Sequence, residues 1–160
     1  MISGSISRAV AIIARAKAPA FPEVRATASA DGRVYYSDLT AGRIFTARVR
    51  GDSVGAAEDT GITALHSFIA PDESFVLLDA KTEGTERDIF VAFRLPDGAW
   101  SELIDLGPGV NTTFSETCPS QSPDGRFLFF SRYDEENEVS NVYWVRSRVV
   151  EAARERLVRR

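Results

Sequence analysis

Bulky apolar residues gather in short runs along this chain, and each run follows a polar turn. The three runs are Val34–Tyr36, Phe75–Leu78 and Phe127–Phe130. β-Branched and aromatic residues dominate them, as is typical of strands. The runs are nearly continuous rather than alternating, which predicts strands that are buried on both faces.

The turns before these runs repeat one another. Each contains an aspartate (Asp31, Asp72 or Asp124), and the steps between them are 41 and 52 residues. We expect these aspartates to stabilise their turns by bonding to their own backbone. Self-similarity at a period of about 40 to 50 residues is typical of β-propellers, in which each repeat is one four-stranded sheet, or blade. The sequence therefore predicts an all-β fold: a partial β-propeller of about three four-stranded blades.

A second strand pattern follows in each repeat. Ile44–Arg48, Ile89–Phe93 and Val142–Arg146 begin 13, 17 and 18 residues after their aspartates. Pro96–Gly98 is a hairpin signal, and Trp100–Leu106 after it is predicted to be an outer fourth strand. Because neighbouring blades cover one another, we expect the aromatic residues of the last repeat to lie in the core: Phe127, Phe129, Phe130, Tyr143 and Trp144.

These patterns divide the chain into a leader, three repeats and a tail. The leader covers residues 1–21 and is either a closing strand or disordered; the blades cover about 22–62, 63–113 and 114–150. Residues 151–160 are predicted to be a short C-terminal helix, because apolar residues share one face and arginines gather near the end.

The composition of the chain argues against only a few classes of function. The chain has 160 residues, 44% of them hydrophobic, which suits one globular domain. Its net charge of −4 argues against a dedicated nucleic-acid binder. With a single cysteine and a single histidine, and without a phosphate-binding or dinucleotide motif, we expect neither a metal nor a cofactor. We also expect no membrane span, because no apolar stretch approaches about 18 residues.

The compartment is left open. The apolar stretch Ala9–Ala14 is short and Arg15 ends it, so an export signal is not convincing and the cytoplasm is the first expectation.

The chain resembles the TolB-type (WD40-like) β-propeller repeat family, whose blades carry a Ser-Pro-Asp-Gly motif. The resemblance covers about four-fifths of the chain and is most specific from His66 to Glu151. The matching segments are Ile69–Ser74, Asp88–Arg94, Leu106–Thr112, Ser122–Gly125 and Val142–Val145. The first repeat departs from the pattern, since Ala30 stands where proline is expected. The resemblance implies the last three blades of a longer propeller and leaves the periplasm open as the compartment, but it says little about function.

Three blades are too few for a closed ring, because propellers have 4–8 blades and the family usually has about six. An open arc would expose apolar faces. We therefore expect either a homodimer that completes a six-bladed ring or further blades in a longer gene product. A third alternative is that Ser5–Ala14 supplies a strand missing after Val150.

Candidate ligand-binding residues follow from the strand before each aspartate, which lines the channel of a propeller. Arg25, His66 and Cys118 lie six residues before the three aspartates, and Glu23 and Glu116 lie eight before two of them. With a strand period of two, all five face the same way. The family resemblance adds that acidic residues are common at the position eight residues before the aspartate.

Each candidate also has an ordinary structural role, as a hydrogen-bonded histidine, a small buried cysteine or a carboxylate that accepts backbone hydrogen bonds. No catalytic residue is therefore assigned. The preferred hypothesis is a non-enzymatic binding or scaffold module for a protein, peptide or carbohydrate. The alternatives are a hydrolase or lyase that uses His66 with Glu116 or Glu23, and an inactive truncated fragment.

Overall fold

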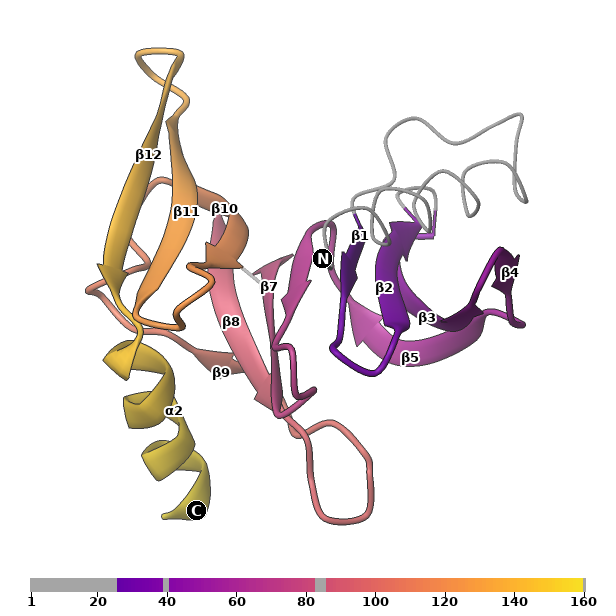
Figure 1. Cartoon of the computed structure of the whole chain (residues 1–160). Coiled ribbons are helices and arrows are strands. Elements are labelled where there is room, and N and C mark those ends of the chain that lie inside the picture. Colours follow the sequence, from indigo (N-terminus) through magenta and orange to yellow (C-terminus); the bar gives the residue numbers. More distant parts are fainter. Residues whose placement is uncertain (1–25, 39–40, 83–85, 160) are drawn as a thin grey trace.

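In the part of the chain that the structure describes, the fold consists of three antiparallel sheets and a C-terminal helix (Figure 1). The computed structural model describes residues 26–38, 41–82 and 86–159. The all-β class with a short helix at the C-terminal end is confirmed. In the described part of the chain, no helix is long and apolar enough to cross a membrane.

The first sheet contains β1 (Ala26–Ala28), β2 (Arg33–Asp38), β3 (Arg43–Arg50), β4 (Ser53–Val54) and β5 (Glu58–Thr63). The first three strands follow one another in antiparallel order. The outer edge of β3 then pairs with β4 near its end and with β5 near its beginning.

The second sheet contains β6 (Ser67–Ile69), β7 (Phe75–Lys81), β8 (Arg87–Phe93) and β9 (Ile104–Asp105), in that order. The strands β7 and β8 are almost wholly buried, as their continuous apolar runs predict. The predicted outer strand forms only in part, because β9 has two residues and Trp100 makes an isolated bridge.

The third sheet contains β10 (Ser115–Gln121), β11 (Phe127–Asp134) and β12 (Val139–Arg146), and the helix α2 (Arg148–Val158) follows. Among the described residues the sheets therefore have five, four and three strands, so the expectation of four strands in each holds only for the second. The helix begins at Arg148 and not at residue 151.

The helix begins before the predicted start at residue 151, and its first turns pack in the hydrophobic core. Val150 and Ala153 are 4% and 0% exposed and belong to the hydrophobic cluster of the second and third sheets. After β12 the chain therefore continues as α2, and the third sheet has no further strand among the described residues.

The aspartate turns have the predicted structure. In each turn the carboxylate accepts a hydrogen bond from the backbone N–H two residues later, at 3.4 Å for Asp31, 3.0 Å for Asp72 and 3.1 Å for Asp124. Serine hydroxyls donate to Asp31 and Asp124 from two residues before. The residue directly after the aspartate has a positive φ in all three turns, and it is glycine in two of them.

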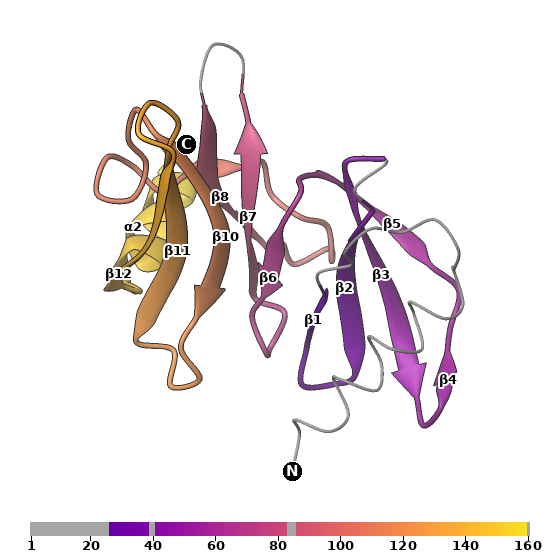
Figure 2. The same cartoon turned by 90° about the horizontal axis from the view of Figure 1, so that it is seen from above.

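The sheets stand side by side with their faces toward one another (Figure 2). The strand β10 contacts β6, β7 and β8, whereas β1 and β2 contact β6. One apolar cluster, with Leu77, Phe93 and Phe130, fills the space between the second and third sheets. Another, with Tyr35 and Leu78, lies between the first and second sheets.

The prediction of a buried aromatic core in the last repeat is wrong for β12. Phe130 is 2% exposed, but Tyr143 and Trp144 are 38% and 61% exposed. Trp144 pairs with Phe129 and lies on the outer face of the third sheet, on which no described sheet packs. Tyr143 lies on the opposite face, where its ring stacks on that of Phe130 at a centroid distance of 6.0 Å but stays partly open to solvent. Burial of the Trp144 ring therefore depends on a neighbouring sheet, not on the strand's own sequence.

Candidate functional site

Two of the five candidate residues come together, and a residue that the sequence analysis did not select lies between them. The side chains of His66 and Cys118 both lie near Asp79 of β7. Glu116 is held by other partners. Glu23 and Arg25 fall outside the described residues.

Asp79 is at the centre of the cluster. Its side chain is fully buried, and it is the only polar residue of the run Phe75–Ala80 in β7. The carboxylate oxygen Oδ2 lies 2.5 Å from Nδ1 of His66 and accepts the backbone N–H of Cys118 at 3.0 Å. The other oxygen accepts the backbone N–H of His66 at 3.2 Å and faces the guanidinium of Arg87 at 3.5 Å. A buried carboxylate is tolerated when it has such partners.

Cys118 reaches the cluster through an irregularity in β10. The register between β10 and β11 shifts between Thr117 and Ser120, which marks a bulge. Cys118 has a φ of 56°, a conformation that non-glycine residues seldom adopt. Bulges redirect side chains and backbone groups, and here the N–H of Cys118 is directed at Asp79.

His66 carries a proton at neutral pH. Its hydrogen bond with Asp79 is the main cause, and a hydrogen bond with Cys118 adds to it; together they outweigh the effect of burial and raise the pKa of His66 to about 9. His66 and Asp79 therefore form an ion pair, and an imidazolium ion cannot serve as a general base. A thiol, an imidazole and a carboxylate in one cluster are suited to nucleophilic cysteine chemistry or to metal binding.

Glu116 has a separate role. Its fully buried carboxylate accepts hydrogen bonds from Nε of Arg132 at 2.6 Å and from the hydroxyl and backbone N–H of Thr112 at 2.7 and 3.0 Å. Arg132 also donates to the carbonyl of Val110. Glu116 thereby fastens the loop before β10 to β11, which is the structural role expected of a carboxylate near a strand end.

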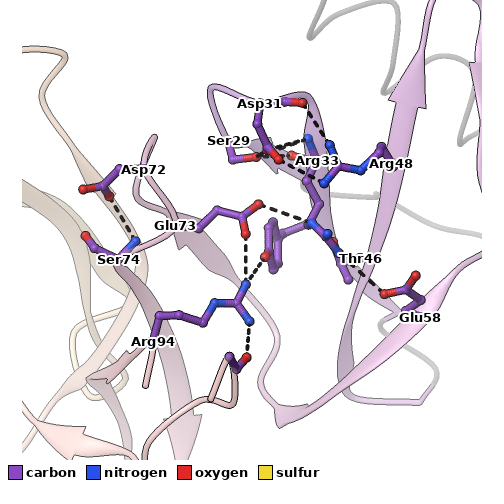
Figure 3. Close-up of polar contacts among 12 residues, drawn as sticks. Ser29, Asp31, Arg33, Thr46, Arg48, Glu58, Asp72, Glu73, Ser74 and Arg94 are labelled. Atoms are coloured by element: carbon purple, nitrogen blue, oxygen red, sulfur yellow. Dashed lines mark hydrogen bonds and ion pairs between the residues drawn. The ribbon is translucent and has the colours of Figure 1, made fainter. Parts of the chain in front are cut away.

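A second polar cluster lies between the first and second sheets (Figure 3). The guanidinium of Arg94 donates hydrogen bonds to the hydroxyl of Tyr35 at 2.9 Å and to Glu73 at 3.0 Å, and it lies 4.0 Å from the centroid of the Trp100 ring. Glu73 also faces Nε of Arg33 at 3.4 Å, without a hydrogen bond.

This second cluster borders a cavity of about 200 Å³. Burial, followed by the charge of Glu73, raises the pKa of Tyr35 to about 12, so its hydroxyl stays protonated and accepts from Arg94. The hydrogen bond between Arg94 and Tyr35 connects the two sheets. The main role of this cluster is therefore to hold the first and second sheets together.

One signal could have identified Asp79 in the sequence. It is a lone carboxylate in the apolar run Phe75–Ala80, where an ionisable residue is costly to bury and needs a partner. Nothing in the sequence indicates that this partner is His66, 13 residues earlier. No protein-family model matches the chain, and no curated protein shows significant similarity to it.

Proposed function

We propose that this chain forms three consecutive blades of a β-propeller and acts as a non-enzymatic binding module for a protein, peptide or carbohydrate. The sheets face one another, and equivalent aspartate turns precede β2, β7 and β11. In this arrangement β1, β6 and β10 are the innermost strands, so that His66 and Cys118 line the channel.

One observation carries the proposal: the outer face of the last sheet is apolar and exposed. Val142 and Trp144 of β12 are 73% and 61% exposed. They pair with Ser131 and Phe129 of β11. The ring of Phe127 packs edge-on against Trp144 at a centroid distance of 5.2 Å. An apolar patch of this kind on a sheet face marks an interface.

The occupant of this face is a second copy of the chain. Within one chain, apolar sheet faces are buried by the sheets of neighbouring repeats, as in the two clusters between adjacent sheets. Two copies with three blades each give six blades, within the known range of 4–8. Further blades of a longer product are the other way to cover the face, and the proposed strand Ser5–Ala14 lies outside the described residues.

Sedimentation velocity at micromolar concentration tests this assembly. The protein is expected to sediment as a dimer, and Trp144→Ser combined with Val142→Ser to shift it to a monomer. Val158→Ser is a matched control, because Val158 is 81% exposed on the helix and away from this face. A wild-type monomer, or a dimer that survives the double substitution, would contradict the proposal.

The contacts of the described residues do not favour a hydrolase or lyase that uses His66 with Glu116. His66 is paired with Asp79, and Glu116 is bound to Arg132 and Thr112. A panel of glycans and peptides, assayed for both binding and turnover, separates the two functions. Binding without turnover supports the module, whereas turnover that His66→Ala abolishes would overturn it.

A further inference from the structure

We propose that His66, Asp79 and Cys118 form a binding site for a divalent transition metal ion of the zinc class. The three side chains offer one nitrogen, one oxygen and one sulfur, and these atoms lie within 4.8 Å of one another. This site does not depend on ring closure, because all three residues belong to one chain.

The donor set is the first support. Zinc in proteins is bound by cysteine sulfur, histidine nitrogen and carboxylate oxygen, usually in tetrahedral geometry. Metal–ligand distances of about 2.0–2.3 Å place the ligand atoms of such a site about 3.3–3.7 Å from one another. The longest separation here, which does not exceed 4.8 Å, is therefore at most about 1 Å too wide. The contact of 2.5 Å between Nδ1 of His66 and Oδ2 of Asp79 is too short by a similar amount. Metal binding would therefore require the side chains of His66 and Cys118 to move by about 1 Å relative to Asp79.

The second support is the rigidity of the central ligand. The backbone N–H groups of His66 and Cys118 and the guanidinium of Arg87 fix the carboxylate of Asp79 in its buried position. Outer partners of this kind orient metal ligands and are part of a functional site. The metal would take the place of the hydrogen shared between His66 and Asp79, and the backbone contacts would stay.

The third support is the strained conformation of Cys118. A positive φ in a residue with a side chain costs of the order of 1 kcal/mol and persists only where the surroundings impose it. Cys118 is the only cysteine of the chain, and in this strained conformation its sulfur lies near a histidine and a buried carboxylate. Strained residues of this kind cluster at functional sites.

The site would link two sheets and keep one open position. His66 precedes β6 and Asp79 lies on β7, whereas Cys118 lies on β10 of the third sheet. The side chain of His66 is 23% exposed, so that a metal can reach the cluster from solvent. Three protein ligands leave a fourth position for water or for a group of a bound ligand, as in non-structural zinc sites.

Titration of the chelator-treated protein with Co²⁺ tests the proposal. We expect one ion per chain and an absorption band from charge transfer between the Cys118 thiolate and cobalt, with Zn²⁺ displacing the cobalt. Cys118→Ser should remove the band and weaken Zn²⁺ binding at least about 10- to 100-fold. Asp97→Asn, in an exposed turn, is the control and should bind like the wild type.

A second measurement needs no substitution. Because Cys118 is the only cysteine, alkylation by iodoacetamide followed by intact mass reports on this thiol alone. Zn²⁺ is expected to slow alkylation of the folded wild-type protein. A rate that Zn²⁺ leaves unchanged would overturn the proposal, and so would cobalt binding without a thiolate band. Rapid alkylation that ignores Zn²⁺ would indicate a nucleophilic cysteine in place of a metal ligand.

Discussion

Two carboxylates of the second sheet show how partners decide whether a buried charge is tolerated. Asp79 is fully buried but has an imidazolium, a guanidinium and two backbone N–H groups around it. Asp88 of β8 is 8% exposed, and its ionised form is opposed by burial first and then by the charges of Asp105 and Glu116. Together these effects raise the pKa of Asp88 to about 6.

The raised pKa of Asp88 predicts a pH-dependent stability. Above pH 6 the carboxylate of Asp88 is ionised in both the folded and the unfolded protein. In the folded protein the buried charge is unfavourable and lowers the free energy of unfolding. This effect disappears as the pH falls through the folded value of about 6 toward the unfolded value of 3.8. Asp88→Asn should therefore raise the free energy of unfolding by about 1–3 kcal/mol at pH 7.5 and by less than about 1 kcal/mol at pH 4. Urea titrations at both pH values measure this, and an equal effect at the two would contradict it.

At the scale of elements, the three aspartate turns share a positive φ at the residue after the aspartate, which glycine adopts most easily. Gly32 and Gly125 follow their aspartates with φ of 85° and 72°, and Glu73 occupies the same place with φ of 58°. A side chain in this conformation is strained. At Glu73 this strain is offset by two ion pairs, in which its carboxylate lies 3.4 Å from Arg33 and 3.0 Å from Arg94.

Two glycines allow this strain to be measured without a change in packing. A Cβ atom added at Gly125 or at Gly109 would meet no atom within 4 Å, but only Gly125 has a positive φ. Gly125→Ala should therefore lower the free energy of unfolding by about 1 kcal/mol, and Gly109→Ala should leave it unchanged or raise it slightly. Thermal or urea denaturation of the pair provides the comparison, and equal effects would show that backbone strain is not the cause.

At the scale of the molecule, the first two sheets are joined by charged and apolar contacts together. Glu73 and Arg94 belong to the second sheet's turns, and they meet Arg33 and Tyr35 of β2 (Figure 3). Arg94 also covers Trp100, whose ring lies edge-on to Tyr35 at a centroid distance of 6.3 Å. Half-buried charges in such a network are expected to contribute more than exposed ones.

A double-mutant cycle on Glu73 and Arg94 measures this contribution. We expect Glu73→Gln and Arg94→Met to show a coupling of about 1–2 kcal/mol in the free energy of unfolding, because the two side chains are only 19% and 28% exposed. The matched control is the pair Arg43–Asp59 within the first sheet, whose side chains are 42% and 41% exposed at 3.1 Å. Its coupling should stay below about 0.5 kcal/mol. A coupling as small for Glu73 and Arg94 would mean that apolar packing alone joins the sheets.

Local patterns alone were enough to predict most strands, the aspartate turns and the C-terminal helix. Each depends on residues close in sequence: a continuous apolar run, a carboxylate two residues from the N–H that it accepts, or apolar positions on one helical face. Counting back from the turns also selected His66 and Cys118 together. The structure places His66 directly before β6 and Cys118 on β10, with their side chains close to each other.

Tertiary structure alone decided what depends on contacts between distant segments. Asp79 joins His66 and Cys118 because β10 packs on the second sheet and a bulge turns the backbone of Cys118 toward it. Trp144 is exposed although its strand is as apolar as the buried ones, since burial requires a neighbouring sheet. Periodicity along a chain specifies which side of a strand a residue occupies, but the partner across that side comes from packing, which no local pattern contains.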